Sequence, residues 1–261
     1  MQELDAAATQ GAVAVEDVAV GDDRLRVLSL QRPGARNAMD TALLEVLLDA
    51  LEVAANDGGL RGLVLTGSGG NFSAGADVRE RTPDGGRRRM ELFTACYERL
   101  TLFPLPTAAA VEGYAVGGGA EAAGACDLRV VAHGAVLRFP GAIYGVPVGV
   151  ARTVGQVGLS TAKDWVLSSR DVPAEEAWRT GFAQRLVADG QARTEAVAWL
   201  TQVAGRDAAT VRVLKQLFNE QGGVRDRLAF ENDALRVHAE TGRLPGEGPA
   251  DLPRTVRPRR R

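Results

Sequence analysis

The sequence predicts an α/β fold with a largely parallel sheet, followed by a helical C-terminal module. As far as about residue 172, short apolar runs of strand length alternate with longer segments of helical periodicity, which is typical of strands joined by helices. Beyond that point the pattern is almost wholly helical. The chain has 261 residues, which is enough to bury a large core.

The first unit runs from the N-terminus to a cluster of glycines. Residues 1–13 show no periodicity, so we expect a flexible lead. Alternating apolar residues at 14–20 and 25–30 predict a hairpin. Asp40 is placed to cap a helix over 41–56, where leucines recur at helical spacing. A buried strand over 62–66 follows and ends at the glycines.

A second unit repeats this order. We expect helices over 87–102 and over the small-residue segment GAEAAGAC, and strands over 107–111 and 128–132. Amphipathic helices are expected at 192–204, 208–221 and 224–241. The predicted organisation is a lead (1–13), a core that carries the site (14–205), a helical module (206–250) and a basic tail (251–261).

Composition excludes several classes of protein. The net charge is -2, too small for a dedicated nucleic-acid binder. No apolar run is long enough for a membrane helix, and the acidic start argues against a secretory signal. Cys96 and Cys126 have the spacing of neither a metal site nor a disulfide framework. We therefore expect a cytoplasmic protein with reduced thiols and no metal, membrane or nucleic-acid partner.

Two glycine-rich turns follow buried strands, at the carboxyl ends where α/β proteins bind ligands. They are NFSAGAD and EGYAVGGGAE. Gly118 and Gly119 open a helix, whose first N–H groups have no intrahelical partner and attract negative charge. Glu121 lies three residues after Gly118, on the same helix face. A carbonyl polarised by the Gly118 N–H would therefore lie near a carboxylate.

Three other roles for these turns must be weighed; the first stays open on these residues alone, and the other two fit the sequence poorly. The glycine triplet can serve tight helix packing alone. Gly117, Gly119 and Ala122 match G-x-G-x-x-A, but dinucleotide binding needs an acidic residue about twenty positions later, and residues 128–163 contain none. Ser73 lacks the G-x-S-x-G frame of a serine hydrolase.

Together, NFSAGAD and VEGYAVGGGAEAAGACDLRVVA resemble the two signature turns of the enoyl-CoA hydratase/isomerase, or crotonase, family, and RPGARNAMD is similar to its early loop. The resemblance covers residues 14–245. It implies a spiral of ββα units and a C-terminal helical module that assembles homotrimers, or a homohexamer of two trimers. It also implies an acyl-CoA thioester as substrate, with no cofactor beyond the coenzyme A that the substrate carries.

The same resemblance implies site residues. It places an oxyanion hole on the N–H groups of Ala76 and Gly118, and the catalytic glutamate on Glu121. Such donors stabilise the charge of a thioester enolate, each being worth roughly 3–4 kcal/mol in other enzymes. Arg79, Arg81 and Arg87–Arg89 form a basic stretch, which either contacts the phosphates of coenzyme A or is a solvated helix start. Arg79 is the one that we place among the substrate-binding residues. The remaining expected substrate-binding positions are Arg36, Ala74, Asp77, Gly117, Gly141 and Tyr144, the last as a proton donor or a wall of the acyl pocket.

One departure from the family pattern concerns a second acid. Hydratases of this family use two glutamates about twenty residues apart to add water. The position twenty residues after Glu121 is Gly141. We therefore expect little hydration, and Gly141→Glu should raise it if the new carboxylate reaches the water. Two functions stay open: an enzyme that relies on Glu121, and a non-catalytic acyl-CoA binding member, to which the segment LRFPGAIYG is similar.

Overall fold

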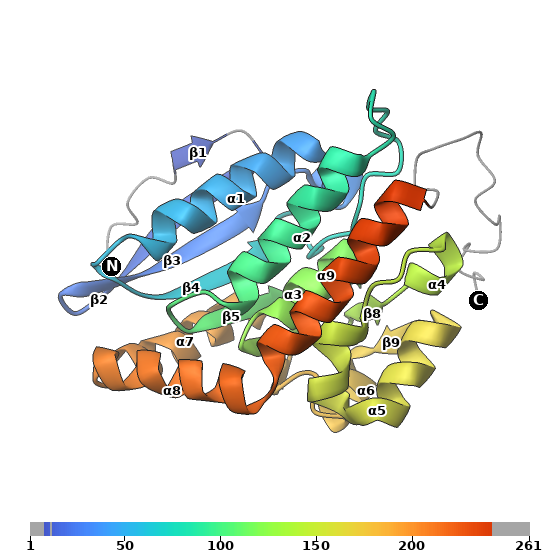
Figure 1. Ribbon diagram of the computed structural model, residues 1–261. Coiled ribbons are helices and arrows are strands. Elements are labelled where there is room, and N and C mark those ends of the chain that lie inside the picture. The colour runs from blue at the N-terminus through green and yellow to red at the C-terminus, as the bar shows by residue number, and fades with distance from the viewer. Residues whose placement is uncertain (1–7, 11, 242–261) are drawn as a thin grey trace.

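The computed structural model describes residues 8–10 and 12–241, which form two sheets and the helices around them (Figure 1). In the described part, the larger sheet has seven strands in the order β1-β2-β3-β4-β5-β7-β10. Its strands are β1 (Ala8–Gln10), β2 (Val13–Val20), β3 (Asp23–Leu30), β4 (Leu60–Gly67), β5 (Thr107–Val111), β7 (Leu128–Ala132) and β10 (Arg185–Val187). The smaller sheet has β6 (Tyr114–Val116), β8 (Val136–Arg138) and β9 (Val172–Pro173).

Pairing in the large sheet changes at β3. The strands β1, β2 and β3 are antiparallel, and every pair from β3 to β10 is parallel. The predicted hairpin and the predicted parallel sheet are both confirmed. The predicted flexible lead is wrong for Ala8–Gln10, which pair with β2, and for Val13, which begins that strand. A three-residue strand is too short to show alternation in the sequence.

Both faces of the large sheet are buried. One is covered by α7 (Ala192–Ala204), and the other by α1 (Thr41–Ala55), α2 (Arg87–Thr101) and α3 (Gly118–Ala125). Successive strand residues point to opposite faces. Val64 accordingly joins the core beneath α7, whereas its neighbour Leu65 joins the core beneath the other helices. This double burial explains the continuous apolar runs.

Local sequence signals set the helix ends. The carboxylate of Asp40 accepts from the Leu43 N–H at 2.9 Å, so the predicted cap of α1 is confirmed. The remaining helices follow β8 along the chain. They are α4 (Gly141–Tyr144), α5 (Val150–Ser168), α6 (Ala174–Arg179), α8 (Ala208–Gln221) and α9 (Val224–Thr241). A short 3₁₀ turn spans Pro33–Ala35. Among the described residues, no helix is long and apolar enough to cross a membrane.

The C-terminal helices fold back on the core of the same chain. In Figure 1, α9 runs beside α2 and crosses α5. Lys215 of α8 donates to the Asp127 carboxylate at 2.6 Å and to the Leu105 carbonyl at 2.8 Å. The helical module is therefore anchored to the core of its own chain. The expected basic tail, 251–261, lies outside the described residues.

Candidate active site

The two glycine-rich turns lie against each other. The Ser73 N–H donates to the Tyr114 carbonyl, and the Val116 N–H donates to the Ser73 carbonyl, both at 2.9 Å. Gly75 has φ +85°, and a Cβ there would overlap the Val116 carbonyl oxygen and lie 3.0 Å from the Gly118 nitrogen. Glycine at residue 75 is thus what allows the turns to meet.

Two unused N–H groups flank this contact. Gly118 is the first residue of α3, so its N–H has no intrahelical acceptor. Met39 bonds to the neighbours of Ala76, namely the Gly75 carbonyl and the Asp77 N–H, so the Ala76 N–H is directed elsewhere. Within the described ranges, neither N–H has an acceptor. The structure therefore brings both predicted donors to the junction of the turns.

Glu121 lies one turn into α3 and is 2% exposed. Its Oε2 accepts a hydrogen bond from Nε of Arg152 in α5. Its Oε1 lies close to the backbone of Gly149, where a Cβ would come within 3.2 Å of it. No donor to Oε1 is found in the part of the chain that the structure describes. Glu121 therefore keeps one oxygen available to a ligand.

A second carboxylate, Glu231 of α9, reaches the same arginine. Its Oε1 accepts from Arg152 Nη2, and its Oε2 accepts from the N–H groups of Val150 and Ala151 at 2.7 and 2.9 Å. Both oxygens of Glu231 are thus engaged, unlike those of Glu121. The Arg152 guanidinium carbon also lies 4.6 Å from the centroid of the Tyr97 ring.

The charge state of Glu121 follows from this surrounding. Burial raises the pKa of Glu121 to about 7, because desolvation of the carboxylate outweighs the opposing effect of the positive Arg152. The negative charge of Glu231 raises the pKa of Glu121 further. A carboxylate with a pKa near 7 suits a general base that works at neutral pH.

Gly141 leaves no room for a second acid. It is buried at the start of α4, and a Cβ there would lie 2.6 Å from the Val146 carbonyl oxygen and 2.9 Å from that of Val148. Both obstacles are backbone atoms, which cannot swing aside as a side chain can. This crowding argues against a carboxylate at residue 141 reaching a bound water on this backbone. Tyr144, at the other end of α4, is half-buried.

The remaining predicted residues of the first turn and the early loop are mostly engaged with protein atoms. The Ala74 N–H donates to the Arg36 carbonyl at 2.9 Å, and the Asp77 carboxylate accepts from Arg32 at 3.0 Å. The Arg36 guanidinium lies over the Tyr114 ring, 5.2 Å from its centroid. None of these contacts brings them to Glu121.

The predicted residues of the second turn and the basic stretch differ in exposure and in hydrogen bonding. The Gly117 N–H donates to the Arg138 carbonyl at 2.9 Å. Arg79 is exposed, as a residue that binds phosphate must be, and so are Arg87 and Arg88. Arg89 is buried and pairs with Glu80 at 2.6 Å, so it is neither solvated nor placed to meet a phosphate.

Three side chains around Glu121 were missed from the sequence: Tyr97, Arg152 and Glu231. Tyr97 belongs to the buried face of α2 and is indistinguishable there from a core residue. Arg152 stands within the acid-free span 128–163, so its carboxylate partners had to come from elsewhere in the chain. Nothing local to α9 marks Glu231 as one of them.

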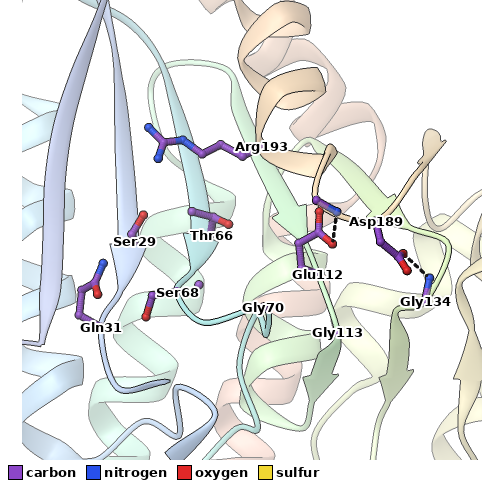
Figure 2. A pocket seen from close by; sticks show the side chains of 12 residues that line it. Ser29, Gln31, Thr66, Ser68, Gly70, Glu112, Gly113, Gly134, Asp189 and Arg193 are labelled. Atoms are coloured by element: carbon purple, nitrogen blue, oxygen red, sulfur yellow. Dashed lines mark hydrogen bonds between the residues drawn. The ribbon is translucent and has the colours of Figure 1, made fainter. Parts of the chain in front are cut away.

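A separate pocket of about 580 Å³ lies beside the start of α7 (Figure 2). The Glu112 carboxylate there accepts from the N–H groups of Gly190 and Ala192, both at 3.0 Å, and Asp189 accepts from the Gly134 N–H at 2.7 Å. Arg193 pairs with Glu16. Its charged groups are therefore already satisfied by protein atoms. None of the predicted site residues lines this pocket.

Comparison with known proteins gives a consistent result. The family model described as enoyl-CoA hydratase/isomerase matches residues 22–242. A probable enoyl-CoA hydratase of Mycobacterium tuberculosis, echA6, is 35% identical over 206 residues, which are 76% of this chain and 80% of that protein. A solved enoyl-CoA hydratase/isomerase from Xanthobacter autotrophicus Py2 has a TM-score of 0.80 at 25% identity, covering 91% of each chain. A monofunctional enoyl CoA isomerase from M. smegmatis has a TM-score of 0.70 at 28% identity, covering 82% of this chain and 94% of that one.

Proposed function

Since this chain belongs to the enoyl-CoA hydratase/isomerase family, we propose that it transfers protons on an acyl-CoA thioester with Glu121 as its single base. The thioester oxygen accepts from the N–H groups of Ala76 and Gly118. Glu121 removes a proton from the carbon next to the carbonyl, and the electron pair of that C–H bond moves onto the oxygen as an enolate. Glu121 then returns the proton to that carbon or to a conjugated one.

One observation carries this proposal. Glu121 has an oxygen with no donor among the described residues, and it lies one turn along α3 from the equally unused Gly118 N–H. With both groups on one helix face, the N–H can bind the thioester oxygen while the carboxylate faces the carbon next to the carbonyl. The pKa of Glu121, raised by burial to about 7, supports a base that both takes and returns a proton near neutrality.

Addition of water fits the site less well. Hydration by this family's usual route needs one carboxylate to activate water and another to protonate carbon. Gly141 stands at the position of the second acid. The other carboxylate nearby is Glu231, and both of its oxygens accept hydrogen bonds, from Arg152 and from the first N–H groups of α5. We therefore propose C–H proton transfer as the main reaction, with hydration slow or absent.

Binding without turnover is the second candidate. The observation that favours it is the ion pair of Glu121 with Arg152, both buried, which is also what a purely structural carboxylate would make. In that case the two N–H donors would still hold the thioester, and Glu121 would serve only to keep α3 and α5 together. The two candidates differ in whether protons leave the substrate.

The deciding experiment follows exchange of substrate hydrogen for deuterium in D₂O by mass spectrometry, over a panel of saturated and unsaturated acyl-CoA thioesters. We expect wild type to exchange, Glu121→Gln to lose at least about 100-fold in rate, and Glu98→Gln, at an exposed position of α2, to match wild type. Acyl-CoA binding with no exchange would establish the binding candidate. Rapid hydration of a short enoyl-CoA would overturn the single-base proposal.

We also propose that the protein assembles as a homotrimer or as two stacked trimers through α8 and α9. These helices leave large apolar side chains exposed, up to 73% for Phe218 and 82% for Phe230, together with Val213, Leu214 and Leu217. Such a surface favours burial against another copy. Light scattering should give a trimer or hexamer mass that Phe218→Glu lowers. A monomeric wild type would refute this assembly.

A cytoplasmic location is proposed on the cysteines. Cys96 and Cys126 are free and buried, and burial raises the pKa of each thiol to about 12. They therefore remain neutral thiols at physiological pH. Proteins of oxidising compartments more often pair their cysteines. Fractionation of the source cells with an antibody to the chain would test this location.

A further inference from the structure

Tyr97 is a polar residue at the candidate site that the proposed reaction does not use. It lies in α2, its ring is 5% exposed, and it packs at a tilt on Phe93 with the ring centroids 5.6 Å apart. A Cβ built on Gly118 would lie 2.5 Å from the Phe93 ring and 3.0 Å from the Tyr97 Oη. The Tyr97 hydroxyl is therefore adjacent to the residue that supplies an oxyanion N–H.

The Tyr97 hydroxyl is also not used in a hydrogen bond within the described part of the chain. Its Oη is not one of the fully buried side-chain atoms that lack a partner among the described residues. The side-chain hydrogen bond that reaches this residue goes to its backbone carbonyl, from Thr101 at 2.8 Å. The hydroxyl therefore keeps some exposure, beside a residue whose N–H is also without an acceptor.

Its surroundings set its protonation state. Burial and the negative charge of Glu121 raise the pKa of Tyr97 well above its ordinary value, although the positive Arg152 opposes them. The phenol therefore stays protonated at neutral pH, as a donor must.

We propose that Tyr97 is a further catalytic residue, whose hydroxyl donates a third hydrogen bond to the thioester oxygen beside the Gly118 N–H. This inference rests on the proposed function, because it needs an acyl thioester at Gly118. The phenol keeps its proton throughout and only stabilises the charge that the enolate oxygen gains. The hydroxyl adds to the stabilisation of the enolate oxygen, for which the family pattern supplies only two backbone donors.

The test is Tyr97→Phe, which keeps the ring and its contact with Arg152 but removes the hydroxyl. Thr101→Val is the matched control, because it removes a hydroxyl from the same helix without touching Gly118. The first measurement is the infrared band of a ¹³C-labelled thioester carbonyl, bound and free. The second compares binding of that thioester with binding of the S-alkyl thioether of coenzyme A, which has no carbonyl oxygen. The third is the deuterium exchange rate.

We expect Tyr97→Phe to move the carbonyl band back toward its position in solution, and to weaken thioester binding without changing thioether binding. Exchange should slow by about 100-fold, as for loss of one oxyanion donor. Thr101→Val should match wild type. Should Tyr97→Phe not fold, 3,5-difluorotyrosine at residue 97 provides a stronger donor, and the band should move further from its solution position.

The outcomes separate the two proposals. A carbonyl band and an exchange rate unchanged by Tyr97→Phe would overturn the role of Tyr97 and leave the Glu121 proposal standing. A band that responds to Tyr97→Phe in a protein that exchanges no protons would retain the hydrogen bond and overturn the proposed reaction. A thioester that binds no better than the thioether in wild type would overturn both.

Discussion

Replacing Gly141 by glutamate tests whether this fold can accept the second acid of a hydratase. The new Cβ would lie 2.6 and 2.9 Å from two backbone carbonyl oxygens, so the segment between α4 and α5 must shift. Overpacking of this kind costs about 1–3 kcal/mol. A buried carboxylate facing carbonyl oxygens without a donor adds about 1–3 kcal/mol. These costs add to about 2–6 kcal/mol, so at about 2–4 °C per kcal/mol we expect the melting temperature to fall by about 4–24 °C.

The assay pairs thermal unfolding with hydration of a short enoyl-CoA followed by absorbance. Gly58→Glu is the control, because a Cβ on Gly58 meets nothing within 4 Å. It should melt close to wild type, and neither variant should gain hydratase activity. If Gly141→Glu melted like Gly58→Glu and hydrated the substrate rapidly, the steric argument would be refuted.

Three further variants probe the site. The kcat/KM of wild type should rise with pH up to about 7 and then level off, because Glu121 must lose its proton to act as a base, and Glu121→Gln should remove this dependence together with the activity. Arg152→Met should cost about 3–5 kcal/mol in the free energy of unfolding, measured in urea, because two buried carboxylates lose their shared cation. Arg152→Met should also move the rising part of the kcat/KM profile to higher pH, since Arg152 lowers the pKa of Glu121. A shift of that rise to lower pH would contradict this. Gly118→Pro deletes an oxyanion N–H, and deuterium exchange should slow by about 100- to 1,000-fold, so an unchanged rate would exclude Gly118 as a donor.

Local patterns in the sequence were sufficient for most of the elements. The leucine spacing of α1 with Asp40 before it, and the apolar run of β5, each express a short-range physical requirement: one buried face, a capped N–H, a strand covered on both sides. The glycines before α3 likewise marked the turn that meets the first glycine-rich turn. β1 escaped prediction because three residues carry no period, and its stability comes from the neighbouring strand.

The order of strands and helices, the two turns, and Glu121 one helical turn from Gly118 can all be read along the chain. The environment of that glutamate emerges only in the folded protein. Arg152, Glu231 and Tyr97 come from α5, α9 and α2, and only folding brings them together around it. The physical reason is that pKa, ion pairing and steric room depend on what lies within a few ångströms in space. Distance along the chain does not encode those neighbours.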